Sequence, residues 1–292
     1  MTSRREFLTT MALGAAALRA NEAEAADPPE IKTALNGPVG LQLYSLREEL
    51  KKDVPGTLAR VRAFGIREVE SAGTWDQSPA EHRAALDKAG LVCRASHMGL
   101  EKLQGDAAGA FKEVKTLGAR WVVCPWIPHD KAFTRDDALK AADAFNGIAK
   151  AAKGEGLRFA YHCHGYEFVP SAEGTLFDTL VGATDKDLVS YEIDVFWAKA
   201  GGADPTKVIE RLSGRVPFLH VKDMKKGISF PAGTSHSEPE GMVPVGTGQV
   251  DWPSVFRAAM KGGAEVYYIE DESLHPLTGI LQSIQYLAGL KL

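Results

Sequence analysis

Short apolar runs alternate with longer amphipathic segments from residue 40 to the end of the chain. The apolar runs are rich in β-branched and aromatic residues, which is typical of buried parallel strands. They predict strands at Gly40–Tyr44, Glu68–Ser71, Val92–Ser96, Trp121–Pro125, Arg158–His162, Val189–Asp194, Pro217–Val221 and Val266–Glu270. The amphipathic segments predict helices at Val54–Phe64, Pro79–Ala89, Ala107–Leu117, Asp136–Lys153, Leu176–Leu180, Pro205–Leu212, Pro253–Met260 and Pro276–Leu287.

Eight strand–helix units of this kind predict an α/β fold, a (β/α)8 TIM barrel in one domain, because parallel strands need both faces covered. The competing architecture is a doubly wound open sheet. No G-x-G-x-x-G motif follows an early strand, which disfavours a dinucleotide-binding version of that sheet. Gly65, Gly90, Gly118 and Gly156 each stand between a helix and the next strand, where a helix C-cap favours a positive φ.

The first residues have the pattern of an export signal and are not expected to form part of the barrel. Arg4 and Arg5 precede a short apolar stretch, Phe7 to Leu18, and Ala23-Glu24-Ala25 resembles a peptidase site. Paired arginines favour the twin-arginine route over the general secretory route, and the apolar stretch is too short to span a membrane. We therefore expect a signal peptide at 1–26, a flexible lead-in at 27–39, the barrel at 40–292, and a periplasmic mature protein without a stable membrane span.

Composition narrows the classes of partner. The formal net charge of the 292-residue chain is −4, with acidic and basic residues interspersed, so nucleic acid is not expected to bind. The chain has three cysteines, Cys93, Cys124 and Cys163, each near the end of a predicted strand. An odd number without close spacing argues against a disulfide framework and against a zinc–thiolate site.

Polar residues gather at the carboxyl ends of the predicted strands, which form the active face of a TIM barrel. The later strands are the richest in carboxylates and imidazoles. The strand-end residues are Gln42, Tyr44, Glu68, Glu70, His97, Trp126, His129, His162, His164, Glu167, Glu192, Asp194, His220, Lys222, Asp223, Glu270, Asp271 and Glu272. Charged groups at such positions are costly to bury unless they are paired or metal-bound, and the mixed set favours a divalent metal. Asp223 has a plain structural alternative, either capping the next helix or pairing with Lys222.

Five short motifs occur in an order that resembles the sugar phosphate isomerase/epimerase family of xylose isomerase-like barrels. They are Tyr161-His162-Cys163-His164-Gly165-Tyr166-Glu167-Phe168, Glu192-Ile193-Asp194-Val195-Phe196-Trp197, His220-Val221-Lys222-Asp223, Val245-Gly246-Thr247-Gly248-Gln249-Val250-Asp251-Trp252 and Ile269-Glu270-Asp271-Glu272. The first is similar to the Y-H-N-H-x-F-E-F motif of a branch that is often secreted, with Cys163 in place of the asparagine.

The resemblance implies one divalent ion, Mn²⁺, Mg²⁺, Zn²⁺ or Co²⁺, held by residues of successive strands. Asp194, His220 and Glu270 match the family's ligands. For the ligand on the fifth strand we select Glu167, because a carboxylate keeps the set rich in hard oxygen donors, with His164 and His162 as the alternatives. Glu167 and Glu270 are then the expected acid–base pair.

The resemblance implies an enzyme of carbohydrate metabolism, an isomerase or epimerase that transfers a proton next to a carbonyl. The expected substrate is a non-phosphorylated sugar or keto-sugar, because the glycine-containing loop 245–251 has no arginine clamp for phosphate. The residues expected to contact it are His97, Trp126, His162, His164 and Lys222.

Three alternatives remain open from the sequence. The first is a lyase or dehydratase on a cyclitol or a 3-keto-glycoside, which shares the same proton abstraction. The second is a non-catalytic periplasmic sugar binder, which would need no metal. The third is a barrel endonuclease, which the negative charge and the few early-strand histidines disfavour.

Overall fold

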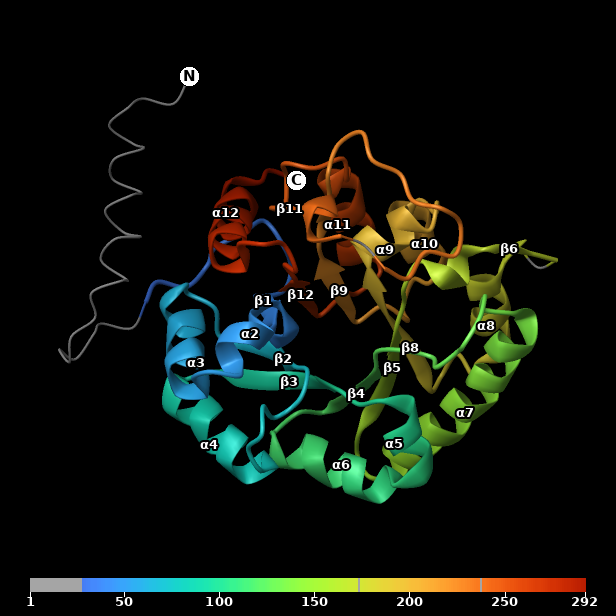
Figure 1. Cartoon of the computed structure of the whole chain (residues 1–292), viewed down its shortest axis with the longest axis horizontal. Helices are drawn as coiled ribbons and strands as arrows, with labels where there is room; N and C mark the ends of the chain where they lie inside the picture. The colour runs from blue at the N-terminus through green and yellow to red at the C-terminus, as the bar shows by residue number, and fades with distance from the viewer. Residues whose placement is uncertain (1–27, 173, 237) are drawn as a thin grey trace.

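The computed structural model describes residues 28–172, 174–236 and 238–292, which form a closed eight-stranded barrel ringed by helices (Figure 1). All neighbouring strands pair in parallel, and the last strand pairs with the first. The barrel strands are β1 (Val39–Gln42), β2 (Glu68–Ser71), β3 (Val92–His97), β4 (Trp121–Cys124), β5 (Arg158–His162), β8 (Val189–Asp194), β9 (Phe218–Val221) and β12 (Val266–Ile269). The predicted single-domain TIM barrel is therefore confirmed. The predicted signal peptide lies outside the described residues.

The eight predicted helices all form, and their ends agree with the sequence pattern to within three residues. They are α3 (Val54–Ala63), α4 (Pro79–Ala89), α6 (Ala107–Thr116), α7 (Arg135–Gly154), α8 (Leu176–Ala183), α10 (Pro205–Arg211), α11 (Trp252–Lys261) and α12 (Pro276–Gly289). The four glycines expected between helix and strand have φ values of +87° at Gly65, +69° at Gly90, +83° at Gly118 and +74° at Gly156. Within the described ranges, no helix is long and apolar enough to cross a membrane.

Several short elements in the loops are not predicted by the sequence pattern. The helical ones are η2 (Leu43–Leu46), α2 (Arg47–Leu50), α5 (Leu100–Gly105), η3 (Tyr166–Phe168), α9 (Val195–Ala200) and η4 (Pro239–Gly241). Two small antiparallel pairs join them, β6 (Pro170–Ser171) with β7 (Gly174–Thr175) and β10 (Asp223–Met224) with β11 (Met242–Val243). The first strand therefore ends at Gln42 and not at Tyr44, because the Gln42 side chain accepts a hydrogen bond from the Tyr44 backbone at 3.0 Å and turns the chain into η2.

Large side chains fill the inside of the barrel below its mouth. Ala95, Trp121, Val123, Ala160, Phe218, Val266 and Tyr268 form this inner core, separate from the larger core between the strands and the helices. Gly40 on β1 makes room for it, because a Cβ at this position would lie 2.6 Å from the ring of Tyr268. This inner core fills the barrel below the strand ends, so the polar groups at the strand ends lie directly above packed apolar side chains.

Candidate metal centre at the barrel mouth

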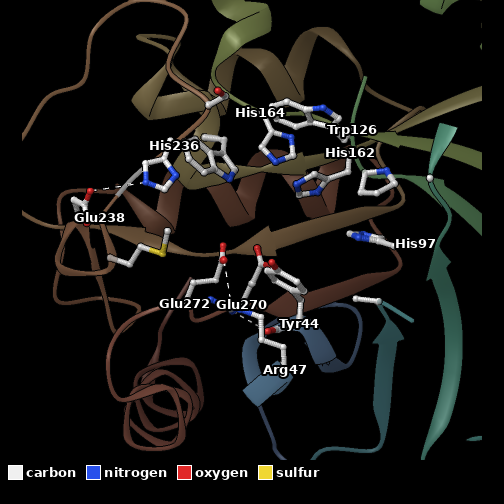
Figure 2. A pocket seen from close by; sticks show the side chains of 16 residues that line it. Tyr44, Arg47, His97, Trp126, His162, His164, His236, Glu238, Glu270 and Glu272 are labelled. Atoms are coloured by element: carbon white, nitrogen blue, oxygen red, sulfur yellow. Dashed lines mark hydrogen bonds and ion pairs between the residues drawn. The ribbon is translucent and has the colours of Figure 1, made fainter. Parts of the chain in front are cut away.

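The carboxyl ends of the strands surround a pocket of about 620 Å³. Figure 2 shows Trp126, His162 and His164 along one wall and Glu270 and Glu272 along the opposite wall. The remaining lining residues are Tyr44, Arg47, Ala72, His97, Gly99, Pro125, Trp197, Ser235, His236, Glu238 and Met242. The lining combines aromatic rings with polar and charged groups.

Three histidines converge on one carboxylate beside this pocket. The Glu192 Oε2 atom lies 3.2 Å from His97 Nε2, 3.1 Å from His162 Nδ1 and 3.1 Å from His220 Nε2. These four residues come from β3, β5, β8 and β9, and we call them the histidine group. Their ligand atoms all lie within 4.8 Å of one another, so the group could hold a metal ion.

Glu70 and Gln42 lie next to the histidine group. The Glu70 Oε2 atom is 2.8 Å from His220 Nε2 and 3.3 Å from His97 Nε2, and it accepts a hydrogen bond from the Gln42 amide at 2.7 Å. Glu70 and Glu192 are fully buried, and each has an Oε1 atom without a hydrogen-bond partner in the described part of the chain. Two buried carboxylates with unused oxygen atoms are costly unless positive charge lies beside them.

A second set of ligands lies on the other side of the His220 ring. Its Nδ1 atom is 3.1 Å from Glu270 Oε2 and 3.8 Å from Asp194 Oδ2, and these three residues form what we call the carboxylate group. Asp194 is fully buried, and its Oδ2 atom has no hydrogen-bond partner among the residues described. The predicted ligands Asp194, His220 and Glu270 are thus brought together.

Lys222 lies beside the carboxylate group and is almost completely buried. Its ammonium is 3.2 Å from Glu270 Oε2, 3.9 Å from Asp194 Oδ2 and 2.5 Å from Glu272 Oε1. It is absent from the pocket lining, although the sequence led us to expect direct contact with the substrate. Arg47 at the rim lies 3.6 Å from Glu272, which extends the charged network to solvent.

Burial and neighbouring charges set the protonation of the centre. Burial by itself lowers the pKa of His97, but Glu70 and Glu192 outweigh it and raise the pKa to about 9. Burial and His220 lower the pKa of His162 to about 4. Burial opposes ionisation of Glu270, yet Lys222 and His220 hold its pKa well below the usual value. Glu270 is therefore ionised at neutral pH.

Glu167, selected from the sequence as the fifth-strand ligand and acid–base partner, lies outside both groups in the described structure. Its carboxylate accepts hydrogen bonds from the Tyr161 hydroxyl and from the His164 backbone N–H, the latter at 3.0 Å. Tyr161 belongs to the outer core and packs on Phe145 of α7, with ring centroids 4.9 Å apart. Because neighbouring strand residues point to opposite sides, His162 faces the barrel interior instead.

The other residues expected to contact substrate lie on the pocket wall. His97, Trp126, His162 and His164 all line the pocket. Trp126 stacks on His129 and meets His164 edge to face, each with ring centroids 5.0 Å apart. His164 keeps a buried Nδ1 atom without a hydrogen-bond partner in the described chain, and burial holds its pKa well below the usual value. It therefore offers a neutral imidazole to the pocket.

Asp223 supports a loop and does not belong to the centre. Its carboxylate accepts hydrogen bonds from the backbone N–H groups of Gly246 at 2.9 Å and Gly248 at 3.0 Å, and from the Trp252 indole at 2.9 Å. Gly248 permits this approach, because a Cβ there would lie 2.2 Å from the carboxylate. The glycine-rich loop thus directs these two amides at Asp223.

The sequence analysis noted Glu70, Glu192 and Gln42 as strand-end residues but assigned them no role. The alternation of side chains along β8 could have identified Glu192 as a site residue. Glu192 and Asp194 are two residues apart, so their side chains lie on the same face of the strand. The pairing of His162 with Glu192 and of Asp194 with His220 across neighbouring strands then builds two layers of ligands. This inter-strand register cannot be obtained from any one motif.

A family model for xylose isomerase-like TIM barrels matches residues 58–290, so the chain belongs to this family. Among solved structures, a sugar phosphate isomerase/epimerase from Parabacteroides distasonis superposes with a TM-score of 0.73 at 26% identity, covering 90% of this chain and 98% of that chain. An IolI protein with a bound zinc atom superposes with a TM-score of 0.65 at 15% identity, covering 86% and 97%. At that identity, the second likeness concerns the fold alone.

The curated relatives are named as dehydratases. The inosose dehydratase of Geobacillus kaustophilus is 25% identical over 209 residues, which cover 60% of this chain and 67% of that protein. The inosose dehydratase of Lacticaseibacillus casei is 28% identical over 160 residues, and the matched region spans half of that protein. These relatives favour the lyase alternative over the isomerase or epimerase that the sequence resemblance implied.

Proposed function

We propose that this protein is a divalent-metal-dependent lyase of the dehydratase type, acting on a cyclic polyol ketone. The observation that carries the proposal is the buried carboxylate group on one side of the pocket, in a chain whose curated relatives are inosose dehydratases. In such a reaction the carbon next to the ketone loses a proton and the following carbon loses its hydroxyl, which together leave as water.

The carboxylate group fits a divalent ion. Asp194 Oδ2, His220 Nδ1 and Glu270 Oε2 combine two hard oxygen donors with an imidazole, a set that suits Mn²⁺, Mg²⁺, Zn²⁺ or Co²⁺. The unused Asp194 Oδ2 atom is the buried acceptor that such an ion would satisfy. When bound, the ion supplies Lewis-acid polarisation of the ketone oxygen and an adjacent hydroxyl.

Glu270 is the proton carrier in this proposal. It lines the pocket, and Lys222 at 3.2 Å keeps it ionised. Its carboxylate removes the proton from the carbon next to the ketone and returns that proton to the leaving hydroxyl. One C–H bond and one C–O bond break, a C=C bond forms, and water departs while Glu270 is again ionised. Return of the proton to the opposite face of that carbon would instead give an epimerase, and its return to a neighbouring carbon would give an isomerase.

The opposite wall orients the substrate. His164 offers a neutral imidazole for a substrate hydroxyl, while Trp126 and Trp197 present aromatic faces to the apolar side of the ring. Together these residues fix which hydroxyl stands over Glu270, and so which C–O bond breaks.

Removal and return of metal tests the proposal. The full-length protein is treated with a chelator, and turnover of an inosose is measured before and after Mn²⁺, Mg²⁺, Zn²⁺ or Co²⁺ is added back. We expect turnover to disappear with the metal and to return with at least one ion, and Asp194→Asn to lose turnover together with the ion of the carboxylate group. Full turnover by a metal-free protein would contradict the proposal.

A further inference from the structure

The His220 ring has carboxylate oxygens on both sides. Nδ1 is directed at Glu270 and Asp194, and Nε2 is directed at Glu70 and Glu192. A neutral imidazole carries one N–H donor and one lone pair, so one side would place a lone pair against a carboxylate. Only a second proton or a cation on that side removes this conflict. A single ion cannot bind both ring nitrogens, because their lone pairs diverge.

The two sides differ in the positive charge already present. Lys222 lies within 4 Å of both carboxylates on the Nδ1 side. Among the described residues, Glu70 and Glu192 on the Nε2 side have no lysine or arginine partner, and their ion-pair partners are all histidines. Both are fully buried and each leaves an oxygen atom unused. The Nε2 side is therefore the one that lacks a permanent cation.

On the Nε2 side, the three separations between Glu192 and the imidazole nitrogens are close to those of tetrahedral coordination, and all four ligand atoms lie within 4.8 Å of one another. Three imidazole nitrogens lie 3.1 to 3.2 Å from the same Glu192 oxygen. Ligands about 2.1 Å from a tetrahedral zinc ion are separated by about 3.4 Å, close to these values. Three imidazoles with one carboxylate favour a borderline ion such as Zn²⁺ or Co²⁺ over the harder Mg²⁺.

We propose that the histidine group is a cation site of its own, on the Nε2 side of His220, selective for an ion of the Zn²⁺ or Co²⁺ type. It shares His220 with the carboxylate group, so the ring bridges the two cation positions as an imidazolate, and its N–H proton is released to solvent when the second ion binds. This inference depends on the proposed function in one respect, namely that the catalytic ion binds on the Nδ1 side of His220. Glu70 is a positioning residue here, since it contacts His97 and His220 but not the pocket.

Titration of the stripped, full-length protein with Co²⁺ tests this proposal, because four-coordinate Co²⁺ absorbs visible light far more strongly than six-coordinate Co²⁺. Bound metal is counted by elemental analysis alongside the spectrum. We expect two Co²⁺ per wild-type chain. Glu192→Gln and His97→Ala should each lose one ion together with the intense band, whereas Asp194→Asn should keep that band. Glu167→Gln is the matched control, a buried carboxylate outside both groups, and should bind as wild type does.

Circular dichroism checks that each variant is folded. Glu192 is fully buried, whereas His97 lies on the pocket wall, so the protein should still fold with His97→Ala even if Glu192→Gln disrupts it. Folded Glu192→Gln and His97→Ala proteins that keep both the ion count and the band would overturn the proposal. A single wild-type ion removed by both Asp194→Asn and Glu192→Gln would also overturn it. One ion kept in Asp194→Asn and lost in Glu192→Gln supports this site while contradicting the carboxylate group as a metal site. Absence of lyase turnover bears only on the proposed function.

Discussion

At the scale of single residues, the centre depends on which charges are paired. Glu270 has Lys222 and His220 as neighbours, whereas Glu192 has only imidazoles. The first arrangement produces an ionised group that faces the pocket, and the second produces a buried anion that attracts a cation. Glu192 and Glu270 therefore differ in their chemistry because their neighbouring side chains differ.

Replacement of Glu270 by glutamine should separate proton transfer from folding. The amide keeps the side-chain shape and one oxygen but cannot accept the substrate proton. We expect turnover to fall by about two to four orders of magnitude while some metal is retained, the range typical of general acid–base groups. Steady-state kinetics with elemental analysis measure both effects. A Glu270→Gln protein within a few-fold of wild-type turnover would end the assignment, because a residue that only pairs with Lys222 affects stability alone.

Glu167 should affect stability and not turnover. Burial raises its pKa to about 8 from an ordinary value of 4.5, so the folded state favours the protonated carboxyl. A raised carboxyl pKa stabilises the fold fully below about pH 4.5, and this contribution is lost as the pH rises towards 8. Relative to wild type, Glu167→Gln should therefore gain stability as the pH increases over that window. Urea unfolding at several pH values checks this, and a parallel dependence in both proteins would refute it.

At the scale of elements, the sequence pattern predicts the barrel well and its loops poorly. Each buried strand carries its own apolar run, and α7 has a full amphipathic period, so both are visible locally. By contrast, α5 and α9 contain six residues each, too few for a repeating apolar face. These short helices follow β3 and β8 and so shape the pocket. The elements whose apolar pattern lies within their own sequence could be predicted, whereas the short elements that depend on contacts with neighbouring loops could not.

The candidate site shows the same division. Asp194, His220 and Glu270 lie together, as their positions at strand ends suggest, whereas Glu167 lies outside both groups, because a carboxylate in a loop can turn either way. The sequence motif gives no sign that the Tyr161 hydroxyl and the His164 backbone hold it on the outer side of β5. Side-chain direction beyond a strand end is set by tertiary hydrogen bonds.

Asp223 should anchor the loop between β11 and α11 (Figure 1). It is almost fully buried and accepts hydrogen bonds from Gly246, Gly248 and Trp252. Asp223→Ala leaves these donors unpaired, so we expect a loss of about 3 kcal/mol or more in the free energy of unfolding. Asp204→Ala, which removes an exposed cap at the start of α10, should cost about 1 kcal/mol. Equal losses in urea unfolding for the two variants would contradict the anchoring role.

At the scale of the whole molecule, we propose that the protein is exported through the twin-arginine route. Arg4 and Arg5 carry this prediction, and they lie outside the described residues. That route carries folded proteins, so the metal could be loaded before export. Replacing both arginines by lysine should leave the precursor in the cytoplasm, as measured by cell fractionation and immunoblotting. Unchanged export would refute the twin-arginine route while leaving other export signals open.

The most direct test of the whole account is the identity of the reaction product. The metal-loaded protein is incubated with an inosose in D₂O, and the products are followed by NMR spectroscopy and mass spectrometry. The account predicts loss of one water molecule, and the C=C bond first formed next to the ketone is an enol that ketonises to a diketone, dependent on metal and on Glu270. Exchange of the proton next to the ketone, or inversion at that carbon, without loss of water would contradict the lyase and restore the isomerase or epimerase.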